Sequence, residues 1–514
     1  MRYNSFTMKR PTVVLFTITN QTNVHTLGLY NLKAYALKHL IYSSKPSIVI
    51  KIYKSKKIIQ NNYSTFFSLT LEEINQIVNW ILKKKPKIVG FSCWLSNSRV
   101  MLQIAERIKK KNKDIKLIFG GPETYHNFFY DTIKIMKKEG AIDIIARYEG
   151  EEVFTELLES ILYNKRDIDD IKGITYRNNN NILVNQERSP MRLDKIPSPY
   201  SKGIMKVRKN AKDVAMEISR GCPYRCSYCS YPLGNYRYYR SFPLERINND
   251  LIFLFNKKVR FINFVESNFN VYEERAKKIL KIIMMHDNKY TKIGIFCNAS
   301  RKLLDEKMAK LFFLSRIMLN IGVQSINPNA LHNANRNTNI KILEKNLSLL
   351  DRHNVKYVLE FIYGLPGDSF VNIKNVINWI FKFRAQRVIF YRLCIERGTP
   401  FFFQRKELGL KYIKVPPFVV SETKELSKSE LKKIEELLAV AEFFYSRYLL
   451  RKIIYQINAV FSLDYVSIFE QFIQWNTSFK PKQWTGKHAY KLLTKYFSYL
   501  LRTKNVNLKK FYSS

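Results

Sequence analysis

Three cysteines, Cys222, Cys226 and Cys229, stand close together in the run Ser-Arg-Gly-Cys-Pro-Tyr-Arg-Cys-Ser-Tyr-Cys that begins at Ser219. This spacing lets three thiolates converge on one centre, and the next histidine along the chain is His286. Structural zinc sites use four ligands, usually as two spaced pairs, so zinc fits this stretch poorly. A four-iron cluster held by three thiolates keeps one iron free to bind a small molecule. The spacing therefore indicates an iron–sulfur cluster with one open position.

Length and cysteine content constrain the rest of the chain. The 514 residues are enough for about three domains, and 46% of them are hydrophobic. Six cysteines are too few for a disulfide framework at this length, and the other three, Cys93, Cys297 and Cys394, are scattered. The N-terminus has no apolar signal core, and no stretch reaches the roughly 18 apolar residues that a membrane span needs. We therefore expect a globular, cytoplasmic protein with no membrane span.

The chain is strongly basic. Lys and Arg number 87 against 42 Asp and Glu, which gives a formal net charge of +45. Such a charge is typical of a nucleic-acid partner or an anionic surface. The lysines are spread along the chain beside abundant Asn and Ile, as AT-biased coding would produce, and no basic arm stands out. A nucleic-acid partner is therefore not expected, although it stays open.

Between Pro11 and about Leu162, short apolar runs alternate with amphipathic helical stretches. Such alternation predicts a parallel sheet with helices on both faces, which is a doubly wound α/β domain over residues 11–165. Ligands of such sheets bind at the carboxyl ends of the strands. The expected strands are residues 13–16, 48–50, 88–91, 115–119 and 142–145.

Three of these expected strand ends carry unusual sequence. Asn-Val-His-Thr-Leu-Gly ending at Gly28 follows the first strand, Ser92 follows the third, and Gly-Gly-Pro-Glu starting at Gly120 follows the fourth. This set resembles a cobalamin-binding domain, in which an Asp-x-His-x-x-Gly motif supplies a histidine ligand to cobalt. The residues that the resemblance assigns to cobalamin are His25, Gly28, Ser92, Gly120 and Gly121.

One position departs from that motif, because Asn23 stands where the family has Asp. A carboxylate behind a ligating histidine fixes the tautomer and raises the basicity of the ring, whereas an amide contributes less charge. Many radical enzymes that resemble this chain bind cobalamin without a histidine ligand. Ligation by His25 is therefore left open, and cobalamin is expected with or without it.

Residues 166–205 are expected to form a hairpin and a linker between two domains. Residues 173–177 and 182–184 are strand-like and flank an Asn-rich turn. Ile-Pro-Ser-Pro-Tyr at residues 196–200 is typical of an extended connection.

A second alternation of strands and helices runs from about Asp213 to Thr399. Six β/α units predict a partial (β/α)6 barrel over residues 206–403. The three cysteines fall in the loop after its first strand, at the face where barrel active sites are built. The expected strands are residues 214–219, 261–265, 293–298, 319–323, 357–362 and 388–393.

The CxxxCxxC spacing, with Tyr228 just before the last cysteine, resembles the cluster motif of radical S-adenosylmethionine (SAM) enzymes. Later strand ends resemble, in order, the SAM-contacting elements of those radical SAM enzymes that carry an N-terminal cobalamin domain. The resemblance covers roughly residues 11–400. It implies that Cys222, Cys226 and Cys229 hold a 4Fe–4S cluster.

The resemblance also assigns residues to SAM. Glu266 would face the methionyl amine, and Gln324 and Ser325 would face the ribose or the carboxylate. The turn that begins at Gly364 would pass close to adenine. The full set implied for SAM is Tyr228, Glu266, Gln324, Ser325, Gly364 and Gly367.

Residues 404–514 are expected to form a helical C-terminal domain. Ser427 and Glu430 form a capping-box pattern, and apolar residues follow at helical spacing. No motif in this segment identifies a substrate.

The resemblance implies reductive cleavage of SAM to a 5′-deoxyadenosyl radical and cobalamin-dependent methylation of an unactivated carbon. An alternative is radical cyclisation, rearrangement or oxidation without methyl transfer. Methylthiolation of transfer RNA would require a second cluster, and Cys93 is the one cysteine of the N-terminal segment. A non-catalytic cobalamin- or metal-binding regulator is the other alternative. The implied partners are a small-molecule or peptide substrate and an electron donor such as flavodoxin or ferredoxin.

Overall fold

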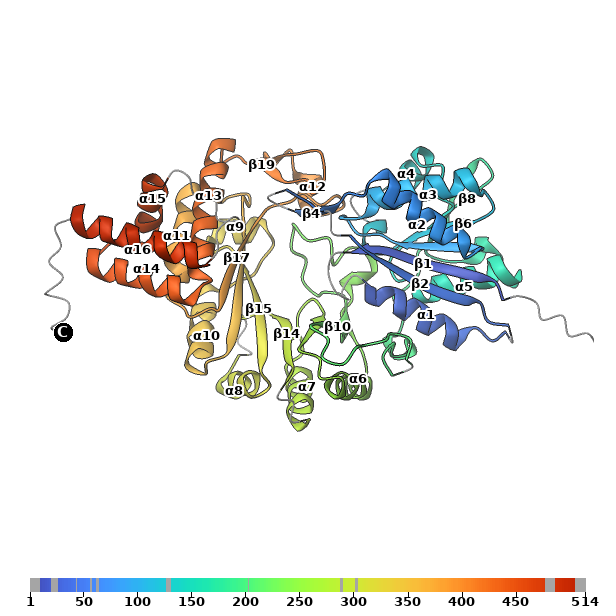
Figure 1. The fold of residues 1–514 in the computed structure, drawn as a ribbon, viewed down its shortest axis with the longest axis horizontal. Helices are drawn as coiled ribbons and strands as arrows, with labels where there is room; N and C mark the ends of the chain where they lie inside the picture. The colour runs from blue at the N-terminus through green and yellow to red at the C-terminus, as the bar shows by residue number, and fades with distance from the viewer. Residues whose placement is uncertain are drawn as a thin grey trace, which may run out of the picture.

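The computed structural model describes residues 10–19, 26–42, 44–55, 58–61, 64–125, 131–201, 203–286, 290–300, 304–476 and 486–503. Figure 1 shows an N-terminal α/β domain at one end, a second α/β unit in the middle and a group of C-terminal helices at the other end. The N-terminal domain and the middle unit each contain a large sheet.

A seven-stranded sheet with the order β2-β1-β5-β6-β7-β8-β9 forms the N-terminal domain. Neighbours from β2 to β7 are parallel, and β8 and β9 continue the sheet in antiparallel pairing. All five predicted strands are confirmed, and the strand order reverses between β1 and β5, which is a topological switch point. The strands are β1 (Thr12–Thr19), β2 (Ser47–Lys54), β5 (Ile88–Ser92), β6 (Lys116–Gly120), β7 (Ile144–Ala146), β8 (Ile174–Asn178) and β9 (Asn181–Val184).

Helices cover both faces of this sheet, as the sequence predicts. Val14 and Phe16 of β1 pack on one face with α2, α3 and α4, while Val13 and Leu15 pack on the other face with α1 and α5. Burial on both sides explains why β1 is a continuous apolar run. The helices are α1 (Leu27–His39), α2 (Leu71–Lys83), α3 (Ser98–Lys111), α4 (Thr132–Lys138) and α5 (Glu151–Tyr163).

Two hairpins belong to this domain. The hairpin predicted after residue 173 forms as β8 and β9, and it joins the N-terminal sheet through β7. A second hairpin, of β3 (Ile58–Asn61) and β4 (Ser64–Phe67), was not predicted. The run 56–67 contains polar residues at most positions, which hides its strand pairing from a periodicity argument.

Six parallel strands in consecutive order form the middle unit, which confirms the predicted partial barrel. The barrel is open between its two edge strands, β10 and β17. Its strands are β10 (Val214–Glu217), β13 (Phe261–Val265), β14 (Lys292–Cys297), β15 (Ile317–Gln324), β16 (Lys356–Tyr363) and β17 (Arg387–Arg392). Its helices are α6 (Leu244–Asn256), α7 (Glu273–Met285), α8 (Glu306–Leu314), α9 (Pro328–Asn333), α10 (Ile340–Arg352) and α11 (Phe370–Ile380).

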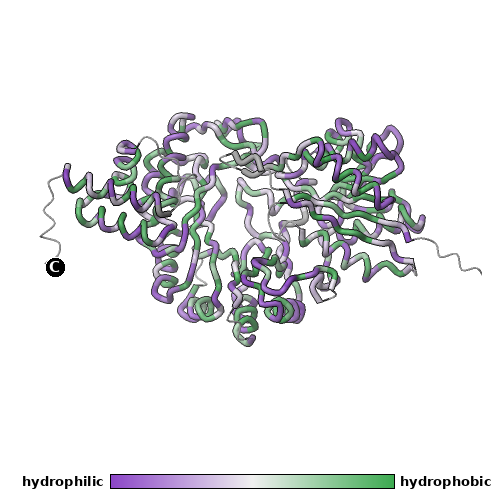
Figure 2. The backbone as a smooth tube through the Cα atoms, viewed as in Figure 1, coloured by the Kyte–Doolittle hydropathy of each residue, from purple (hydrophilic) through white to green (hydrophobic). Residues whose placement is uncertain are grey.

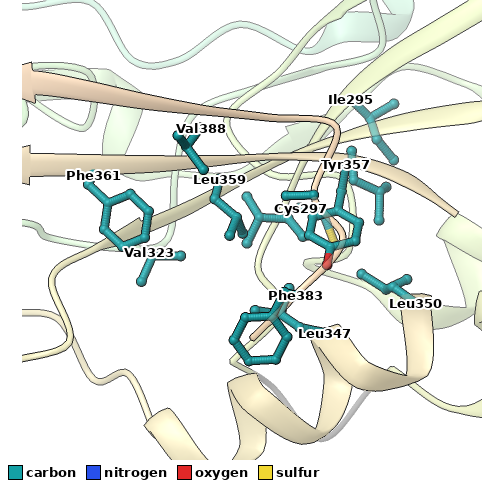
Figure 3. Packing of buried hydrophobic residues seen from close by; sticks show 14 of the residues in the cluster. Ile295, Cys297, Val323, Leu347, Leu350, Tyr357, Leu359, Phe361, Phe383 and Val388 are labelled. Carbon is teal, nitrogen blue, oxygen red and sulfur yellow. The ribbon is translucent and has the colours of Figure 1, made fainter. Parts of the chain in front are cut away.

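The barrel core lies between the strands and the helices that cover them. Alternate residues of each strand, such as Tyr357, Leu359 and Phe361 of β16, pack against helix residues such as Leu347 and Leu350 (Figure 3). Figure 2 shows hydrophobic stretches along the strands and alternating hydrophobic and hydrophilic stretches along the covering helices. The intervening strand residues face the other way, toward the inside of the barrel.

A two-stranded antiparallel ladder, absent from the predictions, lies just after β10. Strand β11 (Ser219–Arg220) precedes the cysteines, and β12 (Arg240–Ser241) follows them. Strands of two residues are too short to produce a detectable sequence period. The ladder closes the base of the loop that carries all three cysteines, and we call residues 221–239 the cysteine loop.

The C-terminal region is largely helical, as predicted, but it also contains the short antiparallel pair β18 (Lys411–Tyr412) and β19 (Val420–Glu422). The predicted capping box forms at Ser427 and Glu430, where α13 begins. Glu442 of α13 accepts a hydrogen bond from the backbone N–H of Phe390 at 3.3 Å, and Ser446, just after α13, accepts one from Val388 at 3.2 Å. This covers the edge strand of the barrel. The helices are α12 (Pro400–Gln404), α13 (Lys428–Tyr445), α14 (Tyr448–Phe461), α15 (Tyr465–Trp475) and α16 (Gly486–Thr503).

Within the described part of the chain, every helix is too short or too polar to cross a lipid bilayer.

Candidate functional site

The cysteine loop is held in place by backbone hydrogen bonds to the far side of the barrel. Ser227 donates its N–H to the carbonyl of Ala334 at 2.9 Å, and its carbonyl accepts from Phe401 at 3.0 Å. The side chain of Asn335 donates to the carbonyl of Arg225 at 2.8 Å. These contacts place the loop over the carboxyl ends of the barrel strands, as its position after β10 predicts.

All six cysteines are free in the described structure. Burial raises the pKa of Cys222, and burial together with Glu396 raises the pKa of Cys229 to about 12. Cys226 and Cys222 also raise the pKa of Cys229, because each thiolate disfavours a second negative charge nearby. The three predicted cluster thiols therefore lie within electrostatic range of one another.

The three thiols do not form a ready-made site for a single metal ion in the described structure. Among the described residues, no three Cys, His, Asp or Glu side chains come close enough to share one metal ion. A 4Fe–4S cluster is larger, and each thiolate binds its own iron, so the cysteines need only surround a common volume. Cys222, Cys226 and Cys229 would hold such a cluster, and the positive charge of the irons would offset the repulsion between the three thiolates.

Arg336, which the sequence analysis missed, lies beside this centre. Its Nη1 is 3.9 Å from the Sγ of Cys226, and its Nη2 donates to the carbonyl of Gly322. Burial disfavours charge on Arg336, but Tyr228 and Cys226 outweigh that effect and raise its pKa. The guanidinium therefore supplies positive charge next to the sulfur of Cys226. No local pattern could have found it, because it is 110 residues from Cys226 in the sequence.

Glu266 lies at the carboxyl end of β13, and its two carboxylate oxygens are buried without a hydrogen-bond partner among the described residues. Burial raises the pKa of Glu266 well above its usual range, although Arg275 opposes the shift. A buried carboxyl group without donors is costly. Its empty acceptor sites fit a cationic or strongly donating ligand group, such as the amine that the sequence analysis assigns to it.

Gln324 and Ser325 lie together at the end of β15. Gln324 has a positive φ of 70°, at a register shift between β15 and β16. The hydroxyl of Ser325 donates to Asp368 at 3.3 Å and accepts from the N–H of Asn327 at 3.0 Å. Ser325 therefore supports the loop in this structure, so a contact with SAM would require its hydroxyl to change partner.

The turn that contains Gly364 and Gly367 lies at the end of β16, and both glycines have positive φ, 81° and 82°. Asn327 donates to the carbonyl of Gly367 at 2.8 Å. An added Cβ at Gly367 would lie 2.7 Å from the Nδ2 of Asn333, so the turn has no room for a side chain there. The same network thus ties this turn to Ser325.

Tyr228 lines a cavity of about 260 Å³ at the open edge of the barrel. The cavity joins the cysteine loop to the carboxyl ends of β16 and β17. Apart from Tyr228, the sequence analysis assigned none of its lining residues to SAM. These residues are Ile362, Tyr363, Phe390, Tyr391, Arg392, Leu393, Cys394 and Glu396.

A second cavity, of about 210 Å³, lies at the carboxyl edge of the N-terminal sheet. Four of the residues assigned to cobalamin line it, namely Gly28, Ser92, Gly120 and Gly121. Asn23 and His25, the remaining positions of that motif, lie outside the described residues. The structure therefore brings the glycines and the serine of the predicted site together around one cavity.

Glycine is required at one position of this cavity. Gly121 has φ +99°, and an added Cβ would lie 2.8 Å from the carbonyl oxygen of Cys93. Two further glycines, Gly90 and Gly150, line the cavity and were not assigned to cobalamin by the sequence analysis. Apolar walls from β1, β6, α1 and α5 complete the space. The cavity lies at a topological switch point, where the ligands of such sheets bind.

The N-terminal cavity is bounded partly by the barrel. Glu217, Arg220 and Val265, which belong to β10, β11 and β13, contribute to its lining. Arg220 is two residues before Cys222, and Val265 is next to Glu266. The two candidate cofactor sites therefore adjoin each other across the boundary between the N-terminal domain and the barrel.

Comparison with known proteins agrees with this arrangement. Residues 216–380 match the Radical SAM superfamily, and residues 57–158 match the B12 binding domain. The chain is 27% identical over 198 residues to the cobalamin-dependent radical SAM methyltransferase TokK of Streptomyces tokunonensis. That alignment covers 36% of this chain and 28% of TokK, less than a third of the length of that relative.

Solved structures share the fold over a larger part of the chain. The cobalamin-dependent SAM radical enzyme OxsB, with aqua-cobalamin and SAM bound, superposes with a TM-score of 0.63 at 15% identity and covers 91% of this chain and 71% of OxsB. The radical SAM methyltransferase TsrM of Kitasatospora setae, with cobalamin and a [4Fe-4S] cluster bound, gives a TM-score of 0.60 at 15% identity and covers 79% of this chain and 76% of TsrM. This chain therefore carries a segment that matches the B12 binding domain ahead of one that matches the Radical SAM superfamily.

Proposed function

We propose that this chain is a radical SAM methyltransferase that uses a 4Fe–4S cluster, SAM and cobalamin to methylate an unactivated carbon. The observation that carries the proposal is the shared boundary of the two sites. The cavity with the cobalamin-assigned glycines is lined by Arg220 and Val265, which are close in sequence to Cys222 and Glu266. Methyl transfer to a substrate radical needs both cofactors close to one substrate. The shared boundary of the two sites would bring them there.

When bound, the reduced cluster cleaves SAM to methionine and a 5′-deoxyadenosyl radical, and cobalamin supplies the methyl group. The protein must bind, orient and shield these groups. Cys222, Cys226 and Cys229 would ligate the cluster, and Arg336 would place positive charge beside the ligand sulfur of Cys226. Hydrogen bonds and charge near cluster sulfur tune reduction potentials.

Glu266 would accept hydrogen bonds from the methionyl amine of SAM. Both of its oxygens are buried and without partners among the described residues, so an ammonium group would satisfy acceptors that are otherwise costly. Tyr228 would border the adenosine end, because it lines the cavity at the ends of β16 and β17. In the N-terminal cavity, Gly120 and Gly121 would let the backbone approach the cofactor closely.

The cluster needs a one-electron donor, for which we propose a flavodoxin or a ferredoxin. A cluster with one open iron and free cysteines also suits a reducing compartment, and we propose the cytoplasm.

Anaerobic reconstitution with iron, sulfide and cobalamin tests the proposal. We expect the absorbance of both a 4Fe–4S cluster and a corrin. With a chemical reductant, SAM and fractions of a cell extract that contain the substrate, we expect 5′-deoxyadenosine and S-adenosylhomocysteine as paired products. Deoxyadenosine without S-adenosylhomocysteine or any methylated product would contradict methyl transfer. It would favour radical cyclisation, rearrangement or oxidation.

A further inference from the structure

Two arginines stand opposite each other at the base of the cysteine loop. Arg220 of β11 and Arg240 of β12 are register partners in the two-stranded ladder. The three cysteines all lie between them in the sequence. Any movement of this ladder would therefore move both ends of the loop together.

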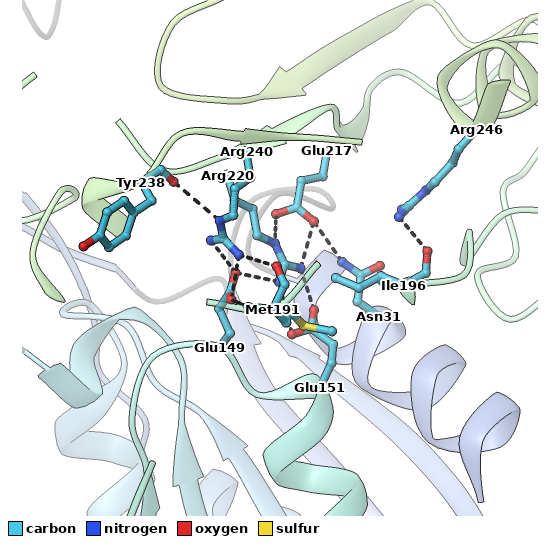
Figure 4. A network of polar contacts seen from close by, with 10 residues as sticks. All are labelled: Asn31, Glu149, Glu151, Met191, Ile196, Glu217, Arg220, Tyr238, Arg240 and Arg246. Atoms are coloured by element: carbon cyan, nitrogen blue, oxygen red, sulfur yellow. Dashed lines mark hydrogen bonds and ion pairs between the residues drawn. The ribbon is translucent and has the colours of Figure 1, made fainter. Parts of the chain in front are cut away.

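Both arginines bind a carboxylate of the N-terminal domain. Arg240 donates to Glu149 through Nη2 at 2.8 Å and through Nη1 at 3.0 Å. Arg220 donates to Glu149 at 3.2 Å and to Glu151 at 2.5 Å. Glu149 and Glu151 flank Gly150, the residue at which α5 is capped, and α5 packs on the sheet of the N-terminal domain. Figure 4 shows the arginine side chains converging on Glu149 and Glu151.

A third carboxylate completes the cluster from the barrel side. Glu217, the last residue of β10, accepts from Nε of Arg220 at 2.7 Å and from the side chain of Asn31 at 3.1 Å. Asn31 belongs to α1, so this contact also crosses from the barrel to the N-terminal domain. We call Glu149, Glu151, Glu217, Arg220 and Arg240 the domain clamp.

The domain clamp is largely shielded from water. The side chains of Glu149 and Glu151 are 5% exposed, and that of Arg220 is 7% exposed. Burial alone opposes charge on Arg220, but Glu151, Glu217 and Glu149 outweigh it and raise the pKa of the guanidinium. Burial likewise opposes ionisation of Glu149, but Arg220 and Arg240 lower its pKa. These shifts favour the charged forms of Arg220 and Glu149, and ion pairs in such surroundings are strong and directional.

Four members of the clamp, Glu149, Glu151, Glu217 and Arg220, also line the N-terminal cavity. The same side chains thus form one wall of the cavity assigned to cobalamin and the base of the loop assigned to the cluster. Radical transfer requires reacting atoms within about 3 to 3.5 Å, and a displacement of roughly 1 Å can cost about a hundredfold in rate. A fixed distance between the two sites would therefore matter for the reaction.

We propose that the domain clamp holds the base of the cysteine loop against α5 and thereby sets the distance between the cluster and cobalamin. Its members are positioning residues, and the inference about distance rests on the proposed function. Arg240 is the member best suited to testing, because its side chain is 18% exposed and lies at the end of the loop farther from Cys222.

The chain contains a matched control. Arg188 also binds α5, through Glu152 and Glu156, and its side chain is also 18% exposed. Both of those contacts stay inside the N-terminal domain. Replacement of Arg188 by Gln removes two ion pairs of the same kind from the same helix.

The first measurement uses the full chain without cofactors, so it does not depend on cobalamin binding. Hydrogen exchange is followed by mass spectrometry in residues 214–242 of wild type, Arg240→Gln, Glu149→Gln and Arg188→Gln. We expect exchange in this segment to be about tenfold faster than in wild type in Arg240→Gln and Glu149→Gln. We expect the wild-type exchange rate in Arg188→Gln. Unchanged exchange in the two clamp variants, or an equal increase in the control, would overturn the clamp.

The second measurement uses the reconstituted protein with equal iron content in every variant. Pulsed electron paramagnetic resonance measures the distance between the reduced cluster and cob(II)alamin. We expect one narrow distance in wild type and Arg188→Gln, a broader distribution in Arg240→Gln, and a return toward wild type in Arg240→Lys. An unchanged distribution in Arg240→Gln would overturn the positioning role. Failure of the wild type to bind any corrin would instead contradict the proposed function. The exchange data would still show whether the domain clamp holds the base of the cysteine loop.

Discussion

Arg220, on the strand that leads into the cysteine loop, donates from Nη2 to Oε1 of Glu151 at 2.5 Å, across the boundary between the barrel and the N-terminal domain. The guanidinium also contacts Glu149 and Glu217. One side chain thus satisfies three carboxylates in a region that excludes water. One buried cation therefore makes three of the ion pairs in the domain clamp.

Replacement of Arg220 by Gln is expected to destabilise the protein. The change removes the guanidinium that binds Glu151 and leaves Glu149 with that of Arg240 alone, and breaking a buried ion pair costs roughly 3 to 5 kcal/mol. Denaturant unfolding followed by tryptophan fluorescence measures the loss. Arg192→Gln serves as the control, because Arg192 is 77% exposed and its pair with Asp194 should contribute less than about 1 kcal/mol. Equal stability of the two variants would contradict this account.

Replacement of Cys226 by Ala is expected to abolish cluster assembly and SAM cleavage. One of three ligand thiols is lost, and no other described cysteine is placed in the loop to substitute for it. Iron content and 5′-deoxyadenosine formation after anaerobic reconstitution provide the measurements. Cys297→Ala is the control, since Cys297 is buried in the apolar core behind β14 (Figure 3) and should leave iron content unchanged. Persistent SAM cleavage in Cys226→Ala would refute the cluster assignment.

Glu266→Gln is expected to weaken SAM binding by roughly tenfold to a hundredfold, because a charged hydrogen bond is worth about 1.5 to 3 kcal/mol. The amide cannot balance an ammonium charge, but it keeps the shape of the side chain. Equilibrium dialysis of SAM against the cluster-loaded protein measures the change, and iron content should stay at the wild-type level. The half-buried pair of Glu273 with Lys277 offers a control in Glu273→Gln, which should bind SAM normally. Normal affinity in Glu266→Gln would exclude the proposed amine contact.

Gly121→Ala is expected to lower cobalamin affinity and local stability. The added Cβ would meet the carbonyl oxygen of Cys93 at 2.8 Å and its nitrogen at 2.9 Å, and φ is +99°. Such strain costs roughly 1 to 3 kcal/mol and would shift a loop that lines the cavity. Cobalamin retention after gel filtration measures the effect. Gly140, which has no atom within 4 Å of an added Cβ, supplies the control Gly140→Ala. Equal retention by both variants would show that the loop tolerates a side chain.

Asp368 should make stability depend on pH. Burial raises its pKa from 3.8 to about 6, against hydrogen bonds from Asn327, Ser369 and Ser325 that lower it. The folded protein then binds more protons than the unfolded chain between these values, so this group's contribution to stability falls as pH rises from about 4 to about 6. Relative to Asp368→Asn, the wild type should lose roughly 2 to 3 kcal/mol over that range. Melting temperatures of both proteins across this range provide the test, and parallel curves would contradict the shift.

Local sequence patterns predicted the elements that depend on local chemistry. The strands of both sheets were predictable because buried parallel strands are apolar runs separated by helical periods. The capping box at Ser427 and Glu430 was predictable because its residues are three apart and bind each other. The position of the cysteines after β10 followed from the same alternation.

The contacts that distinguish the site could not be predicted in this way. Arg336 is 110 residues from Cys226, and Arg220 is 71 residues from Glu149. Glu396 accepts a hydrogen bond from the N–H of Ser230, which is 166 residues away. Each pair meets only because the strands stack in one order and two domains pack together. A residue such as Arg220 is indistinguishable in sequence from the many arginines on the surface.

By itself the sequence determined the two α/β units, the loop with three thiols and the glycines at the ends of the N-terminal strands, since these depend on spacing and residue type over a few positions. Only the tertiary structure decided that Glu266 is buried with no hydrogen-bond donor among the described residues and that Arg336 lies beside Cys226. It also decided that the two candidate sites share a wall of buried ion pairs. The reason is physical: burial and charge pairing depend on which distant segments exclude water from each other, and no local pattern contains that information.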